Sequence, residues 1–393
     1  MIAAVLVLIG AGAILMMHSL FLSYSAIVVL TLVSVCAIIS LATMRRDMET
    51  NFDSPNRSLH APTIPEKAVR LDATIAEAYG NAQAIVTIIS DDGNYDSAVN
   101  LHAVFAKRKL RCTVAGVVKI VKRHKKKWNA LLADDVINMV SHSYTHVPMD
   151  DSETVATDFK ALKHEIVDAG KWFADWLQRK PISFVCPHNK MCELGYKILE
   201  DNGYWAVRRG ARGFNSLSPE AGRQPGQWLN LMVQGIRDQG VDKSARNQWI
   251  DTAINDKKWL IEMWHNVMPE DDHGYQTLLI SEAEEHLNYV AAKSQLNDIW
   301  VASYDDAVKY LLEKQHAHVQ SYVHETRLHI FIELTNDKMS YATFCHPLTL
   351  SVKLPAGLTV SDATQATVAG GALTVDLVPG KEFVVNLQPE AQP

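Results

Sequence analysis

The sequence predicts an α/β protein in which helices connect parallel strands, preceded by an apolar N-terminal segment and followed by a small all-β domain. Three observations lead to this prediction. Residues 81–315 alternate short apolar runs with amphipathic stretches, as parallel βα units do. Residues 1–44 contain no Asp, Glu, Lys or Arg. Residues 316–393 contain period-two alternation split by Pro and Gly, which predicts a β-sandwich.

The elements follow from the local pattern. Strands are predicted where apolar runs are short, and helices where apolar residues recur three or four positions apart. The clearest helix is residues 154–178, which contain Val155, Phe159, Leu162 and Ile166 at this spacing. The other predicted helices are residues 95–108, 128–133, 193–202 and 305–314. The predicted strands are residues 84–89, 112–117, 136–140, 182–186, 205–207, 259–263 and 299–303, and in the all-β domain 328–334, 348–354, 373–377 and 383–387.

The N-terminal segment predicts membrane attachment. One bilayer crossing needs about 20 apolar residues, so residues 1–44 are long enough to cross twice. A secretory signal is the alternative, although no basic region precedes the apolar run. Arg45 and Arg46 favour a cytoplasmic end, whereas the function inferred below favours a membrane-associated or secreted, extracytoplasmic protein. Residues 45–80 are predicted to be a tether that ends in a short helix near residues 75–79.

Composition excludes some classes of protein. The formal net charge of −6 does not suggest a nucleic-acid partner. The five cysteines are scattered and form no CxxC pair, so neither a disulfide framework nor a cysteine zinc site is indicated. The run "KRHKKKW" (residues 122–128) is predicted to be a solvated face, with binding of an anionic polymer as the alternative.

Four predicted strands end in side chains that are able to do chemistry. Asp91 and Asp92 follow the first, His142 and His146 follow the third, and His265 follows the strand at 259–263. The strand at 182–186 runs into Pro-His-Asn. In barrels of parallel strands, catalytic groups collect at the carboxyl ends of the strands.

These residue types indicate a metal site. Two histidines four residues apart can meet one ion, and a carboxylate completes a His₂Asp set with open positions, as in catalytic rather than structural zinc sites. A second carboxylate beside the ligand could take a proton from water, and a further histidine could protonate a leaving group. An Asp-Asp-Gly sequence alone is more typical of a turn, but the spaced histidines favour a site.

"SDDG" followed by "HSYTH" about 50 residues later resembles the NodB-type polysaccharide deacetylases, carbohydrate esterase family 4, over roughly residues 84–315. The resemblance implies a distorted (β/α) barrel with fewer than eight strands. It also implies that Asp91 is the general base and His265 the general acid. Asp92, His142 and His146 would bind the divalent metal, for which zinc is preferred.

The third and fourth family motifs depart from the pattern. The family often has R-x-P-Y-G, whose arginine pairs with the base and whose backbone N–H contacts the oxyanion. Here Val185 stands where the arginine is expected, and the oxyanion contact would fall at His188, after Pro187. Arg208, Arg209 and Arg212 are candidates to replace the arginine. The D-x-x-D-W motif is absent, and Trp249 and Trp264 are the candidates for the apolar wall around an acetyl methyl group.

The predicted function is metal-dependent removal of acetyl groups from a carbohydrate. The predicted partners are an acetylated glycan and, through residues 1–44, a membrane; no oligomeric state is predicted. Two alternatives remain open. One is an amide or formyl hydrolase that acts on a non-glycan or lipid-linked sugar substrate. The other is a membrane-tethered glycan-binding protein that has lost catalysis, against which the five intact core residues argue.

Overall fold

The computed structural model describes residues 61–151, 157–218, 228–270, 274–361 and 366–390. The predicted membrane segment, residues 1–44, lies outside these ranges. In the part of the chain that the structure describes, no helix has both the length and the apolar character needed to cross a bilayer.

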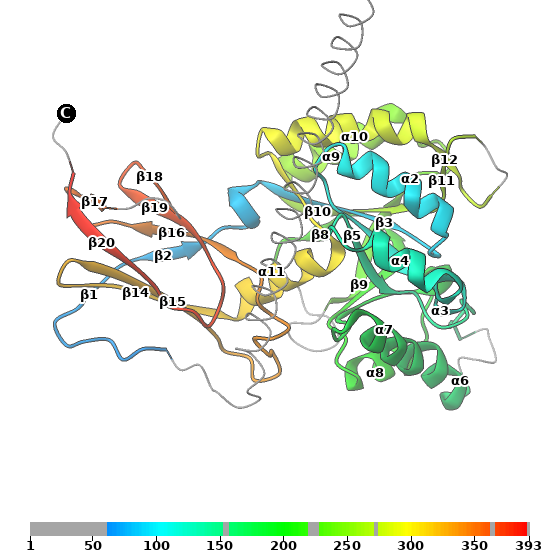
Figure 1. Ribbon diagram of the computed structural model, residues 1–393, viewed down its shortest axis with the longest axis horizontal. Helices are drawn as coiled ribbons and strands as arrows, with labels where there is room; N and C mark the ends of the chain where they lie inside the picture. Colours follow the sequence, from blue (N-terminus) through cyan, green and yellow to red (C-terminus); the bar gives the residue numbers. More distant parts are fainter. Residues whose placement is uncertain (1–60, 152–156, 219–227, 271–273, 362–365, 391–393) are drawn as a thin grey trace, which may run out of the picture. The chain divides into compact units, whose positions relative to one another are not determined.

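Seven parallel strands close into a barrel (Figure 1). The first strand, β3, pairs on one side with β4 and on the other with the last strand, β10, which completes the ring. A parallel barrel with fewer than eight strands was predicted and is confirmed. The strands are, in order around the barrel, β3 (Ala84–Ser90), β4 (Cys112–Gly116), β5 (Ile137–Ser141), β6 (Ser183–Val185), β7 (Ala206–Arg212), β9 (Trp228–Gly235) and β10 (Lys258–Trp264).

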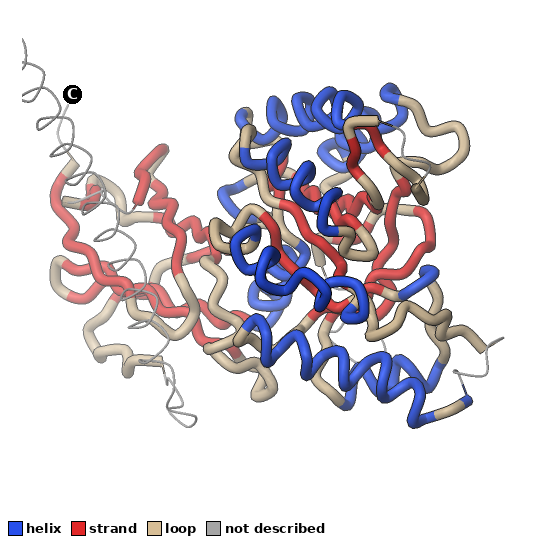
Figure 2. The backbone as a smooth tube through the Cα atoms, turned by 45° about the vertical axis from the view of Figure 1, so that its right-hand side comes forward, coloured by secondary structure: helices blue, strands red, loops and turns tan. Residues whose placement is uncertain are grey.

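Helices surround the strands (Figure 2). Both faces of each strand are therefore covered, which explains the near-continuous apolar runs in the sequence. On β3, Ile85 and Ile89 belong to one core cluster, whereas Val86 and Ile88 belong to a second cluster that includes Phe105 of the covering helix α2. The helices are α2 (Tyr95–Ala106), α3 (Val118–Val121), α4 (Lys125–Leu131), α6 (Phe159–Lys163), α7 (Ala169–Leu177), α8 (Glu193–Asp201), α9 (Lys243–Asn255), α10 (Ile280–Gln295) and α11 (Tyr304–His316).

The predicted long helix at 154–178 is interrupted, and part of it (152–156) lies outside the described residues. Between α6 and α7, His164–Asp168 form a π-helical turn. A π-helical turn inserts an extra residue into the helix and often occurs at functional sites. Here the turn carries Glu165, which is buried.

Several elements around the last strands were not predicted. They include β9 and helices α9 and α10, which together supply one barrel strand and part of the outer layer. Three shorter strands also occur here: β8 (Asn215–Ser216) pairs antiparallel with β10, and β11 (Val267–Met268) pairs with β12 (Leu278–Leu279). The predicted strand at 299–303 is β13 (Ile299–Val301), which pairs with the first half of β3 rather than entering the ring.

The C-terminal region contains two antiparallel sheets, as predicted, with strand orders β1-β14-β15-β20-β17 and β18-β19-β16-β2. Alternate residues from both sheets, such as Ile330 and Leu350, share one core cluster. The strands of this region are β14 (Ala317–His324), β15 (Arg327–Leu334), β16 (Leu348–Lys353), β17 (Leu358–Val360), β18 (Ala366–Ala369), β19 (Ala372–Leu377) and β20 (Phe383–Pro389).

The predicted short helix near residues 75–79 is wrong. The chain instead forms β1 (Val69–Arg70) and β2 (Ala73–Ile75), which pair with β14 and β16, before a 3₁₀ turn at Tyr79–Asn81. Pairing with neighbouring strands provides hydrogen bonds for the backbone N–H and C=O groups, which in a helix would bond to one another. Two short stretches of the predicted tether, β1 and β2, therefore belong to the β-sheets.

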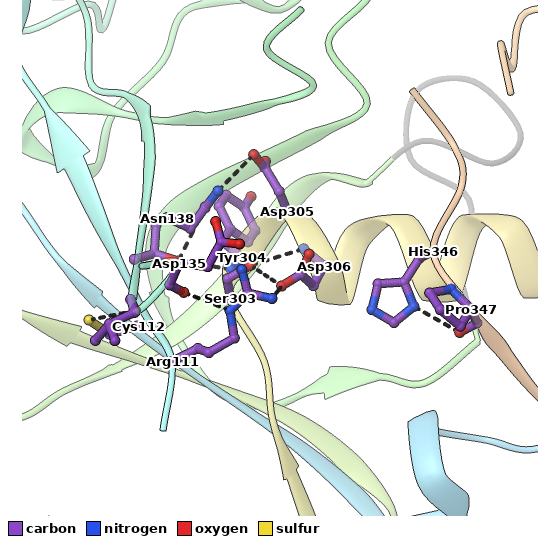
Figure 3. A network of polar contacts seen from close by, with 12 residues as sticks. Arg111, Cys112, Asp135, Asn138, Ser303, Tyr304, Asp305, Asp306, His346 and Pro347 are labelled. Carbon is purple, nitrogen blue, oxygen red and sulfur yellow. Dashed lines mark hydrogen bonds and ion pairs between the residues drawn. The ribbon is translucent and has the colours of Figure 1, made fainter. Parts of the chain in front are cut away.

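Helix α11 fixes the amino ends of the barrel strands through a network of polar contacts (Figure 3). The Ser303 hydroxyl caps the helix by accepting the Asp306 N–H, at 3.2 Å. Arg111, just before β4, donates to Asp306 at 2.6 Å, and Asn138 of β5 donates to Asp305 at 3.1 Å. This network lies at the end of the barrel opposite to the predicted site.

The last turn of α11 carries a buried carboxyl group. Glu313 Oε1 accepts the His346 N–H at 3.0 Å, which links the helix to the β-sheets. Burial raises the pKa of Glu313 well above its usual value; the hydrogen bond from the His346 N–H and the charge of Lys309 oppose this effect, and Asp306 adds to it.

Candidate metal centre

Asp92, His142 and His146 converge at the carboxyl ends of β3 and β5. Asp92 Oδ1 lies 3.3 Å from His146 Nε2 and 3.7 Å from His142 Nε2. The two Nε2 atoms are 3.2 Å apart. One ligand atom from each residue thus falls in a group whose members lie within 4.8 Å of one another. The sequence predicted these three residues as one set, and the structure brings them together.

The turn after β3 places Asp92 in an unusual backbone conformation. Asp92 and Gly93 have φ angles of 75° and 77°. Positive φ is uncommon for a residue with a side chain, although Asp tolerates it better than most. A Cβ at position 93 would lie 2.6 Å from Val121 Cγ1 and 3.1 Å from the Gly116 Cα. The close approach and the positive φ therefore both require glycine after the two aspartates.

The loop that joins the two histidines is held by Glu165 of the π-helical turn. Its carboxylate accepts the N–H of Tyr144 at 3.1 Å, and both the N–H of Thr145 at 2.8 Å and its hydroxyl at 2.6 Å. Ser143 Oγ also accepts the His146 N–H at 3.0 Å. Glu165 was not identified from the sequence, because a carboxylate within an amphipathic helix looks like any solvated charge. It positions the loop without belonging to the cluster.

His142 presents a free Nε2 lone pair to the cluster. Its Nδ1 donates to the Val185 carbonyl at 2.8 Å, so Nδ1 carries the proton of the neutral ring. Burial, reinforced by the nearby His146 and opposed by Asp92, lowers the pKa of His142 to about 3. The ring is therefore neutral at pH 7, which is the form that binds metals.

His146 connects the cluster to its surroundings. Its pKa is lowered, mainly by burial; Asp92 and Asp91 oppose this effect, whereas His188 and His265 reinforce it. These four side chains are thus close enough to His146 for their charges to affect its protonation. The fold therefore brings Asp91, His188 and His265, which are far apart in the sequence, close to His146.

Asp91 is paired with Arg208 in the interior of the barrel. Arg208 Nη2 donates to Asp91 Oδ2 at 2.7 Å, and the two side chains are 0% and 4% exposed. Asp91 Oδ1 is also buried and has no hydrogen-bond partner among the described residues. Of the three arginines considered as replacements for the one missing at Val185, Arg208 makes this contact. Arg208 lies on the same strand face as Ala206, which packs in the core with Ile85, so alternation along β7 separates it from Arg209.

His265 follows β10 and is 9% exposed. Its ring packs edge-on against Tyr275, with centroids 4.7 Å apart. The backbone of His265 is fixed because its carbonyl accepts the Ser90 hydroxyl at 2.7 Å. Its Nδ1 is buried and unpartnered within the described part of the chain.

Pro187 and His188 lie at the end of β6. Pro187 is buried, whereas His188 is exposed, with a φ of 52°. The His188 ring lies against that of His146, with centroids 4.6 Å apart, and its Nε2 is 3.2 Å from the His146 carbonyl. The structure thus brings His188 to the edge of the cluster.

Trp264 does not line the site. It is completely buried in the core cluster that contains Phe105 and helix α10, and its indole N–H donates to Glu262 at 2.9 Å. Because strand residues alternate between faces, Trp264 points outward from the barrel while Met263 points inward. The prediction that Trp264 forms the wall around an acetyl group is therefore wrong. Trp249, the other candidate, packs against the same outer cluster.

The cluster fits a divalent cation. Two neutral imidazole nitrogens and one carboxylate oxygen form a common donor set for zinc and similar ions, and three protein ligands leave positions open. The Val185 carbonyl orients His142 as outer-shell partners orient metal-binding histidines. Two facing Nε2 atoms and a carboxylate at these separations would be drawn together by a shared cation.

No family model and no curated protein matches the chain. Among solved structures, it is similar to a protein assigned as a polysaccharide deacetylase from Mycobacterium smegmatis, with 11% identity, coverage of 62% of this chain and 95% of that chain, and a TM-score of 0.46. It is also similar to a family 4 carbohydrate esterase from Streptomyces lividans in complex with acetate (14% identity, 56% and 93% coverage, TM-score 0.38). A family 4 acetyl xylan esterase from Clostridium thermocellum with a cobalt ion gives 12% identity, 57% and 89% coverage, and a TM-score of 0.39.

These identities and TM-scores are too low to identify a family. The resemblance therefore depends on the sequence motifs and on the geometry of the site. The chain resembles the NodB-type polysaccharide deacetylases in the order of its two motifs, in its parallel barrel, and in the Asp-His-His cluster that those motifs form.

Proposed function

We propose that the protein is a metal-dependent hydrolase that removes acetyl groups from a carbohydrate. The observation that carries this proposal is the cluster of Asp92, His142 and His146, with the arginine-paired Asp91 next to it in the sequence. The motifs that supply these residues are those of the polysaccharide deacetylases. An extracytoplasmic, membrane-associated or secreted location, attributed to residues 1–44, is part of the proposal.

The three clustered residues would hold the cation, with zinc as the preferred ion. When bound, such an ion supplies Lewis acidity that polarises an acyl carbonyl and, in the case of zinc, lowers the pKa of water to about 7. The remaining chemistry belongs to the side chains around it. Removal of an acetyl group needs a base for the attacking water, a donor for the oxyanion and an acid for the leaving group.

Asp91 is the proposed general base. Arg208 occupies Oδ2, so the carboxylate is held in one orientation. Oδ1 has no partner among the described residues and remains available to accept the proton of the attacking water. Arg208 also supplies the counter-charge beside this buried carboxylate, because an unpaired buried charge is costly. It is a positioning residue for the base.

His265 is the proposed general acid, and the backbone N–H of His188 the proposed oxyanion donor. Tyr275 packs on the His265 ring and limits its rotation. A proton held on His265 would pass to the departing amine or alkoxide, which leaves acetate and a deacetylated sugar. Pro187 restricts the backbone that leads to His188, which favours a fixed direction for its N–H.

The test is acetate release from acetylated oligosaccharides before and after chelation. Activity that is lost on chelation, returns with zinc, and is abolished in Asp91→Asn would support the proposal. Glu284→Gln, a change in a half-buried carboxylate that pairs with Lys107 on the outer helices, is the matched control and should keep full activity. Release of acetate that is insensitive to chelation would contradict the proposal.

A further inference from the structure

A cationic segment lies beside the proposed site. Residues 119–127, here called the basic segment, contain six Lys or Arg side chains and no Asp or Glu, in a chain whose net charge is −6. All six of these side chains are exposed. Within the described ranges, none of them lies within ion-pair distance of a carboxylate. The charge of the segment is therefore open to a partner outside the chain.

The segment is rigidly attached to the core. Val118 and Val121 are buried beneath it, and Trp128, which follows it, is also completely buried. The tryptophan packs edge-on against Tyr95, with centroids 5.5 Å apart. These apolar contacts hold α3 and α4 in place, so the cations project from a fixed surface rather than from a loose loop.

Helix stability does not explain the position of these charges. Lys125, Lys126 and Lys127 form the first turn of α4, which has no acidic residue there and no side-chain cap. Positive charge at the amino end of a helix interacts unfavourably with the helix dipole. Binding of an anion to the surface would offset this penalty.

The basic segment adjoins both loops of the metal centre. The Val117 N–H, just before it, donates to the Asp92 carbonyl at 3.3 Å. The N–H groups of Val118 and Lys119 donate to the carbonyls of Ser143 and Tyr144 at 3.1 and 2.9 Å. The cations therefore begin at the rim of the cluster and extend away from it along α3 and α4.

Half-buried aromatic rings alternate with the cations. The ammonium groups of Lys122, Lys125 and Lys127 lie 5.4, 5.7 and 5.5 Å from the ring centroids of Tyr144, Trp172 and Tyr95, respectively. Tyr144 belongs to the loop between the two histidines, so one of these three rings lies beside the metal centre. The exposed ammonium groups over the rings suit acidic substituents on a sugar chain.

We propose that the basic segment binds an anionic polysaccharide and that the acetylated sugar of the same chain lies at the metal centre. This inference rests on the proposed function and narrows its substrate class to glycans that carry carboxylate or similar acidic groups. A polyanion with regular negative charge complements a row of fixed cations better than a neutral glycan does. Contact with the metal-site loops favours a substrate over a membrane surface.

The test measures binding separately from catalysis. A fluorescently labelled oligogalacturonate is titrated into the full chain and into the variant R123E/K126E, which reverses two exposed charges. The control variant K338E/K353E makes the same change on exposed lysines outside the barrel. We expect R123E/K126E to weaken binding by about tenfold or more, and added salt to weaken binding to the unmodified chain. The control should change the affinity less than twofold.

Equal affinity in all three proteins, or no binding at all, would overturn the inference. A second result would also overturn the inference, in favour of a membrane-facing surface. In that case the unmodified chain binds vesicles that contain anionic lipid but does not bind oligogalacturonate, and R123E/K126E no longer binds the vesicles. Failure of the proposed function gives a different result. In that case oligogalacturonate binds and depends on the basic segment, but no acetate is released from acetylated oligogalacturonate.

Discussion

Replacement of Arg208 by alanine is the most informative single change in the barrel. It removes the partner of Asp91 and leaves a buried carboxylate with neither a charge partner nor a donor to Oδ2. Exposed fractions of 0% for Arg208 and 4% for Asp91 mean that water cannot readily take the place of the guanidinium. The variant therefore tests whether this pair holds the proposed base in the interior.

The expected magnitude follows from the geometry. With charge centres about 4 Å apart and an effective dielectric constant of about 20, the attraction is about 4 kcal/mol. Removal of one partner of a buried pair lowers the free energy of unfolding by about 3–5 kcal/mol, because the other charge stays desolvated. Arg208→Ala should fall in this range. Arg209→Ala, in the neighbouring half-buried side chain that lies 5.8 Å from the Tyr196 ring centroid, should cost less than about 1 kcal/mol.

The assay is denaturant unfolding of the full chain, of both arginine variants, of Asp91→Asn and of the double variant Arg208→Ala/Asp91→Asn. If the two side chains act as a pair, the double variant should be more stable than the sum of the single changes predicts, by about 1–3 kcal/mol. Additive effects, or equal losses in Arg208→Ala and Arg209→Ala, would refute this reasoning.

Three further predictions concern other residues. Gly93→Ala forces a Cβ to within 2.6 Å of Val121 at a φ of +77°, so the midpoint of thermal unfolding should fall, with a loss of more than about 1 kcal/mol; an unchanged midpoint would contradict the described turn. Glu165→Ala removes the carboxylate that accepts hydrogen bonds from the loop between the histidines, and it should weaken zinc binding by about 10–100-fold in a competition titration. Asp168→Ala removes an exposed carboxylate from the same turn and should leave zinc binding unchanged. The pKa of Glu313 is raised in the folded protein, so its contribution to stability is present below about pH 4.5 and is lost as the pH rises. When the free energy of unfolding is measured against pH, the value for Glu313→Gln should therefore rise relative to that of the unmodified chain above this pH. Parallel profiles for the two proteins would contradict the prediction.

The strand ends could be predicted from the sequence because each one combines two local signals. A short buried strand must end where polar residues begin, and parallel strands bring their carboxyl ends to the same side. This argument is sufficient to group Asp92, His142 and His146 from the sequence. It could not show which of three nearby arginines reaches Asp91, because that depends on which face of β7 turns inward.

Other features depend on contacts that are distant in the sequence. Glu165 becomes a positioning residue only because a π-helical turn directs it at the loop between the histidines. Trp264 is a candidate for the wall around the acetyl group in the sequence, but alternation along the strand directs it into the outer core. β1 and β2 are too short to show a pattern, and they exist because β14 and β16 offer free edges.

The stoichiometry of zinc bound to the purified full chain tests the central claim most directly. After removal of bound ions, equilibrium dialysis against zinc should load one ion per chain, and His142→Ala should abolish this loading. His102→Ala removes a histidine that pairs with Asp134, away from the cluster, and should leave the stoichiometry at one. The same stoichiometry in the unmodified chain and in His142→Ala would contradict the assignment of Asp92, His142 and His146 as a metal centre.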